Sequence, residues 1–199
     1  MTVQILINDL KKWAEEKICN IQFKRPSDKN TDQTYDYKLV KPAVFAMFVP
    51  TEDRLPAGVE DIFPSVCIQW TDDDERPQEH KGSAKIRLQL GLWNPGLHAE
   101  DILADYTAKE GELAKPTPGF TRDAEGWGDL INWIDLIKRE LRNNDFICGK
   151  YRIKLEDGVQ SGPASEQGTI LDFYPYYFGY VEFAIEYSNP QAKSFNNLL

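Results

Sequence analysis

Metal coordination is the first chemistry that the residue types allow, because histidine, cysteine and clustered carboxylates are the usual protein ligands. The chain has two histidines, His80 and His98, and neither is paired with a carboxylate or a cysteine at ligand spacing. The acidic run 72–75 offers the oxygen ligands that Ca²⁺ and Mg²⁺ prefer, but it lacks the alternating spacing and the glycine of a calcium loop. We therefore expect a solvated turn there, with a weak ion site as the alternative, and neither a resident metal nor a cofactor.

Nucleophilic catalysis has no motif in this chain. The three cysteines, Cys19, Cys67 and Cys148, are scattered without CxxC or Cys/His spacing, and we expect them to be buried, reduced thiols. No Gly-x-Ser-x-Gly elbow is present, and none of the 32 acidic residues stands out as half of an acid–base pair. The sequence therefore predicts a protein that is not an enzyme and has no catalytic residues.

Phosphate binding is the remaining possibility, because Gly126-Trp127-Gly128 opens a predicted helix and helix N-termini attract anions. Neither GxxxxGK[ST] nor a GxGxxG that follows a strand occurs, and the acidic residues nearby would repel a phosphate group. The better interpretation is that Asp123 or Asp129 caps this helix.

Charge and composition exclude further classes of function. The net charge of −9 and the pI near 4.8 disfavour nonspecific binding to nucleic acid and attachment to an anionic membrane. No signal-peptide pattern opens the chain, and the longest apolar run, Ala43–Val49, is too short to span a bilayer. We expect a protein that folds in a reducing cytoplasm as a single domain over residues 1–199.

Two amphipathic helices are predicted, over residues 3–19 and 126–141, from apolar residues that recur every three or four positions. Thr2 is a candidate N-cap for the first helix. The stripe of the second helix consists of Trp127, Leu130, Trp133, Ile134, Ile137 and Leu141. Both helices would lay one face on a common sheet.

Alternation of apolar and polar residues predicts the strands of that sheet. Residues 65–70 and 85–93 form a hairpin with a long acidic tip at 71–82, and residues 151–155 and 181–187 add two strands. The apolar run 43–49 suits a strand covered on both faces, by the core or by a neighbouring subunit. The expected fold class is α+β, a largely antiparallel or mixed sheet packed by two main helices, with long loop insertions.

Four segments are expected to lie outside this framework. They are a polar loop at 26–37, a charged insertion at 94–125 with a short helix at 99–109, a flexible loop at 158–168, and a flexible tail at 189–199.

Candidate surfaces for association come from apolar residues that a core does not obviously require. The aromatic cluster 173–180 is best explained by core packing or a subunit interface, since base stacking needs a basic groove that is lacking here. Ile131 and Leu136 lie off the apolar stripe of their helix. The candidate interface residues are Val44, Phe45, Met47, Phe48, Ile131, Leu136, Tyr174, Tyr176, Tyr177 and Phe178.

Four motifs accompany this order of elements: Lys41-Pro42-Ala43-Val44-Phe45, Phe63-Pro64-Ser65-Val66-Cys67-Ile68, Gly126-Trp127-Gly128-Asp129-Leu130 and Pro175-Tyr176-Tyr177-Phe178-Gly179. Together, the order and the motifs resemble the tail-terminator family of long-tailed phages and prophages. The resemblance covers about two thirds of the chain. The motifs are patterns of apolar residues and turns, not catalytic signatures. The insertion at 95–125 and the excursion at 26–37 depart from the family's shorter pattern.

The resemblance implies a non-enzymatic ring, usually a hexamer, that caps the tail tube and joins it to the head. The implied partners are further copies of the chain, the tail tube protein and a head-completion protein, with DNA passing through the ring. The implied localisation is the host bacterial cytoplasm during assembly and then the virion tail. A sister role, as another minor tail or head–tail connector protein, is also open.

An acidic surface fits such a ring, because like charge prevents DNA from sticking as it passes. We expect the acidic tip to point into the lumen or toward the end of the tube, or else to be a solvated turn. Its residues are Asp72, Asp73, Asp74 and Glu75. The competing functions are a small-molecule or peptide-binding domain that uses the cluster 173–180, and a hydrolase that uses unassigned carboxylates.

Overall fold

The computed structural model describes residues 3–26, 37–76, 78, 80–95, 124–171 and 173–188. Several expectations fall outside these residues and are not tested by it: the cap at Thr2, most of the loop 26–37, the helix at 99–109 with most of its insertion, and the tail 189–199. Within the described residues, none of the helices is long and apolar enough to cross a membrane.

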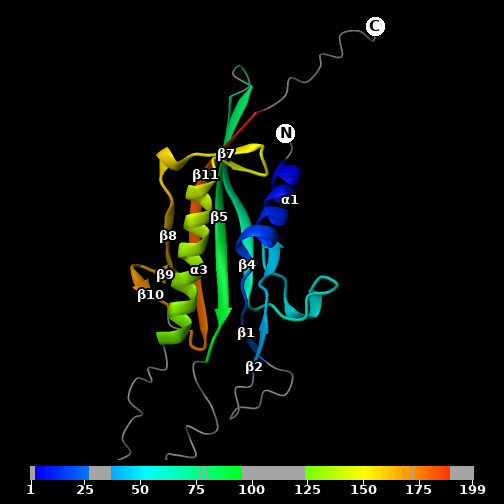
Figure 1. Cartoon of the computed structure of the whole chain (residues 1–199), viewed down its shortest axis with the longest axis vertical. Coiled ribbons are helices and arrows are strands. Elements are labelled where there is room, and N and C mark those ends of the chain that lie inside the picture. Colours follow the sequence, from blue (N-terminus) through cyan, green and yellow to red (C-terminus); the bar gives the residue numbers. More distant parts are fainter. Residues whose placement is uncertain are drawn as a thin grey trace, which may run out of the picture.

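A seven-stranded mixed sheet forms the centre of the molecule (Figure 1). Its order is β3-β4-β5-β11-β7-β6, and β8 pairs with β11 beside this path. Only β3 and β4 are parallel among the described pairs. The strands are β3 (Ala43–Ala46), β4 (Ser65–Arg76), β5 (Lys81–Trp93), β6 (Phe146–Ile147), β7 (Tyr151–Ile153), β8 (Gln160–Pro163) and β11 (Tyr176–Ser188). The α+β class expected from the sequence is confirmed.

Two small antiparallel pairs flank this sheet: β1 (Phe23–Pro26) with β2 (Tyr37–Val40), and β9 (Ser165–Glu166) with β10 (Thr169–Ile170). Short 3₁₀ turns lie at η2 (Glu52–Arg54) and η4 (Leu155–Asp157).

Two helices cover one face of the sheet, and both were predicted. The first, α1 (Val3–Trp13), continues as a π-helical turn, η1 (Ala14–Ile18), and the second is α3 (Ala124–Asn143). A hydrogen bond of 2.8 Å from the Trp133 indole Nε1–H to the Ile18 carbonyl joins the two helical segments. We refer below to this side of the sheet as the helix face.

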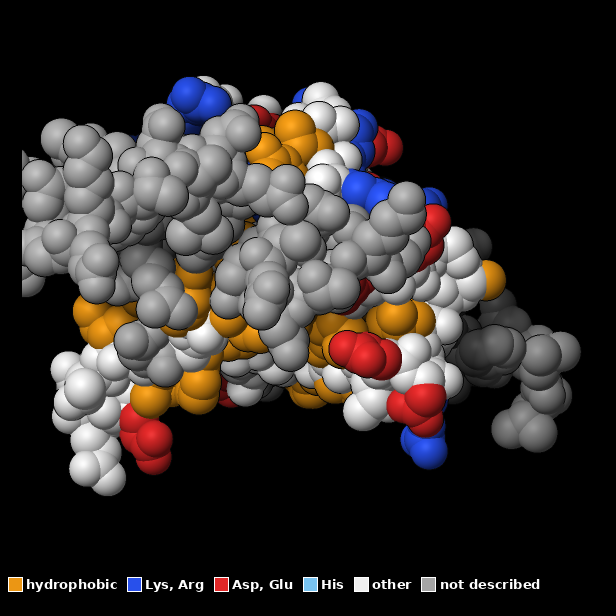
Figure 2. All heavy atoms as spheres, turned by 90° about the horizontal axis from the view of Figure 1, so that it is seen from below, with side chains coloured by type: hydrophobic (Ala, Val, Ile, Leu, Met, Phe, Trp, Pro, Cys, Tyr) orange, Lys and Arg blue, Asp and Glu red, His pale blue; other side chains and the backbone are white. Residues whose placement is uncertain are grey.

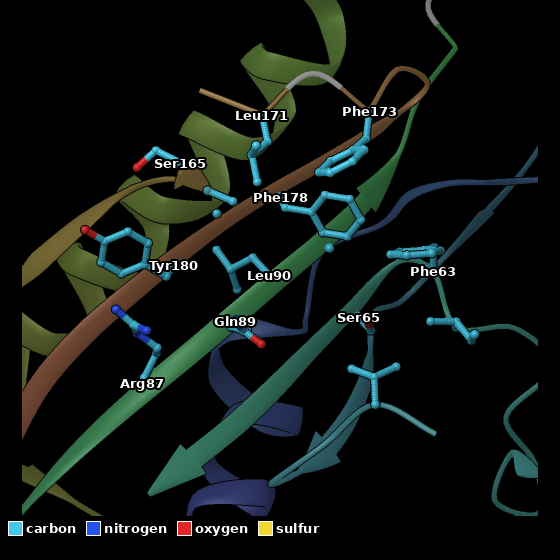
Figure 3. A pocket seen from close by; sticks show the side chains of 15 residues that line it. Phe63, Ser65, Arg87, Gln89, Leu90, Ser165, Leu171, Phe173, Phe178 and Tyr180 are labelled. Atoms are coloured by element: carbon cyan, nitrogen blue, oxygen red, sulfur yellow. The ribbon is translucent and has the colours of Figure 1, made fainter. Parts of the chain in front are cut away.

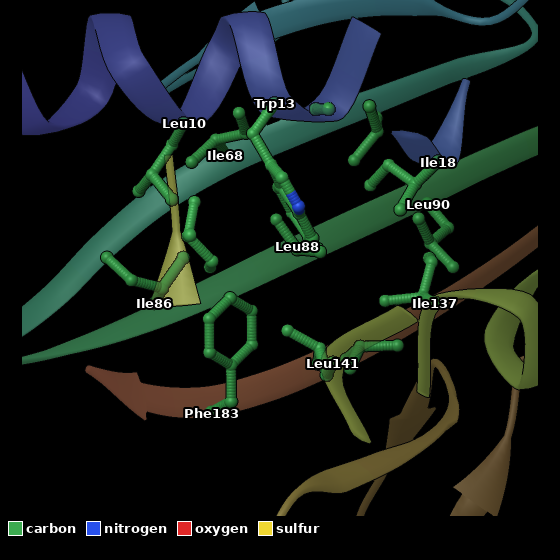
Figure 4. Packing of buried hydrophobic residues seen from close by; sticks show 14 of the residues in the cluster. Leu10, Trp13, Ile18, Ile68, Ile86, Leu88, Leu90, Ile137, Leu141 and Phe183 are labelled. Atoms are coloured by element: carbon green, nitrogen blue, oxygen red, sulfur yellow. The ribbon is translucent and has the colours of Figure 1, made fainter. Parts of the chain in front are cut away.

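The core lies between this face and the two helices (Figure 4). Leu88 is paired with Val181 and Ile86 with Phe183 in the β5–β11 register, so the apolar residues of both strands point to one side. Leu10 and Trp13 from α1 and Ile137 and Leu141 from α3 pack over them. The alternation read from residues 85–93 and 181–187 is therefore the pattern of one continuous core.

The β4–β5 hairpin was predicted, but its acidic residues were misplaced. Both strands run further than expected, so that the acidic run 72–75 lies on β4 and not in a turn. The register shifts between Trp70 and Asp72, and the acidic residues then pair with 82–85 of β5. A run of four acids lacks strand propensity, and cross-strand pairing overrides it here.

Three further expectations are corrected by the strands. The segment 158–168 is not a flexible loop, since β8 pairs with β11 and β9 with β10. Strand β11 begins at Tyr176, inside the supposed aromatic cluster. Strand β3 ends at Ala46, at the edge of the described sheet, so residues 47–49 of the apolar run 43–49 are not part of a strand.

Candidate interaction surface

No helix or strand of the described residues covers the centre of the sheet face opposite the two helices. Gln89 on β5 and Tyr180 on β11 form a cross-strand pair that points away from the helix face. The irregular chain before β4 borders this open face on one side, and the segment around β9 and β10 borders it on the other. Between them lies a groove of about 590 Å³, which we call the open-face groove (Figure 3).

One end of this groove is aromatic. Phe63, Phe173, Tyr176 and Phe178 form what we call the aromatic hollow, a shallow and widely open recess of about 370 Å³ that is lined, among the described residues, by these four side chains. The Phe63 ring centroid lies 5.0 Å from that of Tyr176 and 5.7 Å from that of Phe178. Phe173 and Phe178 meet edge to face at 5.8 Å. These separations are those of favourable aromatic pairs, so the rings support one another's positions.

A glycine in β5 makes room for one of these rings. A Cβ atom at Gly91 would lie 2.7 Å from the Phe63 Cε1 atom, so only glycine lets the ring rest on the strand in this position. The Phe63 backbone N–H also donates to the Asp61 carboxylate at 3.2 Å. The shape of the hollow therefore depends on a residue in the sheet as well as on its aromatic walls.

The other end of the groove is polar. The Arg87 guanidinium lies 4.8 Å from the centre of the Tyr180 ring, and its Nε is 3.1 Å from the Glu182 carboxylate. Figure 3 shows Arg87 and Tyr180 at this end and Phe63 and Phe173 at the other. The groove is thus amphipathic along its length, with a cation that already has a carboxylate partner.

The electrostatics of the hollow disfavour anions. Burial raises the pKa of the Tyr176 hydroxyl, and the nearby carboxylates Asp61 and Glu52 raise it further. The same burial and the same negative charges that disfavour the phenolate of Tyr176 would also disfavour a phosphate or carboxylate ligand. Figure 2 views the end of the sheet where β5 finishes and β11 begins, and it shows hydrophobic side chains there with acidic ones beside them.

Apolar residues that follow β3 border the same groove, because Val49 is among the residues that line it. Met47, Phe48 and Val49, which we call the apolar turn, are 43, 70 and 39% exposed. Met47 has a left-handed backbone with φ of 67°. The turn is held because the Met47 N–H donates to the Ile68 carbonyl and the Phe48 N–H to the Ala46 carbonyl, both at 2.8 Å. The backbone therefore presents Phe48 outward in a defined position.

The ten predicted interface residues divide by burial. Met47, Phe48, Ile131 and Tyr176 are exposed, and Val44, Leu136, Tyr174 and Phe178 are partly buried. Phe45 and Tyr177, 4 and 2% exposed, are corrections to the prediction, because they are buried inside this subunit and offer almost no surface. Tyr177 lies on the helix face of β11 and packs edge to face on Trp127 at 5.2 Å.

The exposed candidates do not form one surface. Met47, Phe48 and Tyr176 belong to the apolar turn and the aromatic hollow, whereas Ile131 lies on α3, in the helical layer. Phe63 was not predicted as a member of any site. The Gly91 in an otherwise regular strand is the signal that could have indicated a close approach by a side chain.

The four acids of β4 are all exposed, but they are not equivalent. The Tyr187 hydroxyl donates to the Asp73 carboxylate at 2.7 Å, which ties this acid to β11. The Arg76 guanidinium lies 3.5 Å from the Asp74 carboxylate. Asp73 therefore has a structural role within the subunit, and the acidic surface consists chiefly of the other three residues.

The thiols are not activated. Burial raises the pKa of Cys19 to about 12 and that of Cys67 to about 11. Cys148 is exposed, contrary to expectation, and its pKa is also raised, by desolvation and then by Asp9. Among the described residues, no group of three or more His, Cys, Asp and Glu side chains could hold a metal ion, and His98 lies outside them.

A polar cluster, the clasp, joins the two ends of the insertion. The clasp consists of Lys24, Asn94, Glu125 and Asp129. Asn94 is 2% exposed, and its amide donates to Asp129 at 2.7 Å while its oxygen accepts from Lys24 at 3.1 Å. Lys24 also pairs with Glu125 at 2.9 Å. The clasp therefore holds the end of β5 against the start of α3.

These surfaces are suited to binding another apolar surface. The described residues bring together aromatic and aliphatic side chains on the open face. No family model matches this chain, and no curated protein matches it.

Proposed function

We propose that this chain is a non-enzymatic structural protein of a long-tailed phage or prophage, which assembles as a ring, caps the tail tube and joins it to the head. The observation that supports it best is the contrast between the closed helix face and the open face. The latter leaves an apolar turn and an aromatic hollow accessible to a partner.

Two different apolar surfaces on one chain suit a ring. Copies related by a closed rotation meet through heterologous contacts, so each subunit presents one surface to one neighbour and a different surface to the other. Aromatic side chains and methionine are enriched in the centres of such interfaces. The apolar turn and the hollow have this composition and lie on separate segments of the chain, and both border the open-face groove.

The acidic strand end supports passage of DNA in this proposal. Asp72, Asp74 and Glu75 line the lumen or face the tube end, where their charge keeps the phosphate backbone from binding. Replacing these three residues by lysine should slow or block DNA passage. Asp73 is left unchanged in the test because its bond to Tyr187 is structural. Unchanged infectivity and assembly in the triple variant would remove this part of the proposal.

The first test is the mass of the purified protein in solution by light scattering over a wide range of concentration, followed by negative-stain imaging. A ring of about six 22.9 kDa chains is the expected result. If the isolated chain is a monomer, purified tail tubes are added, since the tube end can template the ring. A chain that is monomeric and also fails to bind tubes would contradict the proposal.

A second candidate function is supported by the open-face groove. Its volume of about 590 Å³, its apolar end and its few polar groups are those of a small-molecule or peptide site. This candidate predicts a monomer that binds a ligand, with binding lost on replacement of Phe178 or Tyr180. The solution mass and the response to tail tubes therefore distinguish the two functions.

A further inference from the structure

We propose that Phe48 of one copy inserts into the aromatic hollow of a neighbouring copy, and that this contact is the centre of the interface between subunits. The inference rests on the proposed ring and deepens it by naming the side chains that meet. It commits to a second copy of this chain as the occupant of the hollow.

The inserting side chain is large and exposed. Phe48 is 70% exposed, the highest value among the large exposed hydrophobic residues of the described chain. The two backbone hydrogen bonds of the apolar turn fix its main chain, and the Gln69 side chain also donates to the Met47 carbonyl at 3.4 Å. A main chain that is already ordered loses less conformational entropy when a partner buries its side chain.

The hollow matches a phenyl ring in chemistry. The described residues that line it are all aromatic, and Phe173 and Tyr176 retain 52 and 37% exposure, so ring edges and faces are available to an incoming ring. A ring seated there would gain aromatic pair contacts beyond the burial of its area. Phe48 does not line the hollow of its own subunit, so it is available to another copy.

The charges around the hollow favour a neutral occupant. Asp61 and Glu52 lie close enough to act on Tyr176, and an anionic ligand would be repelled. The phenyl group of Phe48 carries no charge, and every copy of the chain supplies both it and a hollow. A second copy therefore supplies a neutral aromatic occupant for the hollow.

One phenylalanine side chain buries too little area to hold two subunits together by itself. A phenylalanine buries about 150–250 Å², whereas a stable interface buries about 800 Å² on each partner. Phe48 is therefore an anchor at the centre of a wider contact to which Met47 and Tyr176 also belong. Such anchors account for most of the binding energy of an interface.

The first experiment cross-links the two surfaces. One copy carries Met47→Cys and the other Glu52→Cys, an exposed residue close to Tyr176 that leaves all four rings of the hollow in place. Cys148→Ser removes the exposed native thiol from both copies. Mild oxidation of the mixed copies, free and on tail tubes, should give a linked pair. The matched control combines Ile131→Cys, 55% exposed on α3, with Glu52→Cys. Cross-linking no greater than in this control, both free and on tubes, would overturn the inference.

The second experiment uses two variants, each of which removes one half of the contact. Phe48→Asp keeps a hollow and loses the inserted ring, and Phe173→Asp keeps the ring and damages the hollow. Each alone should fail to form the wild-type assembly, whereas their mixture should give a species of two 22.9 kDa chains. Circular dichroism confirms that each variant is folded, which is expected because both side chains are exposed.

The outcomes separate this inference from the proposed function. If Phe48→Asp and Phe173→Asp both retain the wild-type assembly while Ile131→Asp breaks it, the ring uses the helical layer and the inference is wrong, but the proposed function stands. If the wild-type chain neither assembles nor binds tubes, and no cross-link forms, both are wrong.

Discussion

The two faces of the central sheet differ in how completely they are covered. On the helix face, the cross-strand neighbours Leu88 and Val181 are both fully buried beneath α1 and α3. On the open face, the next pair along, Gln89 and Tyr180, borders a groove. The difference separates two tasks within one strand: the residues that point toward the helices hold the fold, and those that point away are available for binding.

The largest expected effect comes from the helix face. Leu88→Ala should lower the free energy of unfolding by about 2–5 kcal/mol, because a fully buried leucine leaves a cavity in a close-packed core. Urea unfolding measures this change. Gln89→Ala, one residue along the same strand and exposed, is the matched control and should stay within about 0.5 kcal/mol of the wild type. Equal losses from both changes would contradict the division between the faces.

The clasp gives the next effect, because it joins the helical layer to the end of β5. Asn94→Ala should destabilise the protein by about 1–3 kcal/mol, since Asp129 loses a donor and Lys24 an acceptor in a buried site. Thermal unfolding at pH 7 measures the loss. The comparison variant is Asn144→Ala, whose exposed side chain bonds to Glu140 at the end of α3 and should matter less.

Two acids on the helical side, Asp129 and Asp9, should change the free energy of unfolding in opposite directions as the pH changes. Burial raises the pKa of Asp129 above 3.8, so its stabilising effect is full below pH 3.8 and is lost as pH rises through the higher folded-state pKa. Asp129→Asn, which can still accept the Asn94 bond, should therefore be more stable than the wild type at pH 7. The gain should vanish below pH 3.8.

Asp9 provides the contrasting case. Hydrogen bonds from Lys150 and Tyr151 lower its pKa below 3.8, so its contribution is present above pH 3.8 and is lost as pH falls through the lower folded-state pKa. Asp9→Asn should be less stable than the wild type at pH 7, with a difference that shrinks in acid. Thermal unfolding of both variants from pH 7 to pH 3 gives the comparison, and shifts of the same sign would contradict it.

A substitution at Gly91, in the floor of the groove, should have the smallest effect on the free energy of unfolding. Its effect on assembly should be larger. Gly91→Ala places a methyl group against the Phe63 ring and should displace it, closing part of the hollow. Because the ring lies in a partly open recess, the unfolding free energy should change by only about 1 kcal/mol. Gly162→Ala, whose new atom would lie 3.9 Å from Tyr180, is the control. Light scattering should show weaker assembly in the first variant only.

Local patterns predicted the elements that form the core. The 3.6-residue period of 126–141 and the alternation in 85–93 and 181–187 are consequences of burying one side of a helix or strand, and they can be read from order alone. The acidic residues of β4 and the segment 160–170 could not be predicted in this way. Their strands depend on backbone pairing: residues 72–75 pair with 82–85 of β5, β8 pairs with β11, and β9 pairs with β10. Backbone hydrogen bonds of this kind require no alternation of apolar and polar side chains, so they leave no pattern in the sequence.

The sequence predicted only some residues of the candidate site, because it does not show where strand β11 begins. The sequence marked Phe48, Tyr176 and Phe178 as unusual apolar residues, but not Phe63, and it counted Tyr177 and Phe45 among them. Adjacent residues on a strand point to opposite faces, so Tyr177 belongs to the core and Phe178 to the groove. That separation becomes visible only once the strand is known to begin at Tyr176.

The order of residues by itself determined the two helices, the α+β class and the apolar face of each core strand, because amphipathic periodicity follows directly from one-sided burial. The tertiary structure alone decided which side chains meet across the open face. Phe63 and Phe173 are far apart in sequence and lie together only because β4, β5 and β11 are neighbours in the sheet. A surface assembled from distant segments depends on the topology of the chain, which local periodicity does not encode.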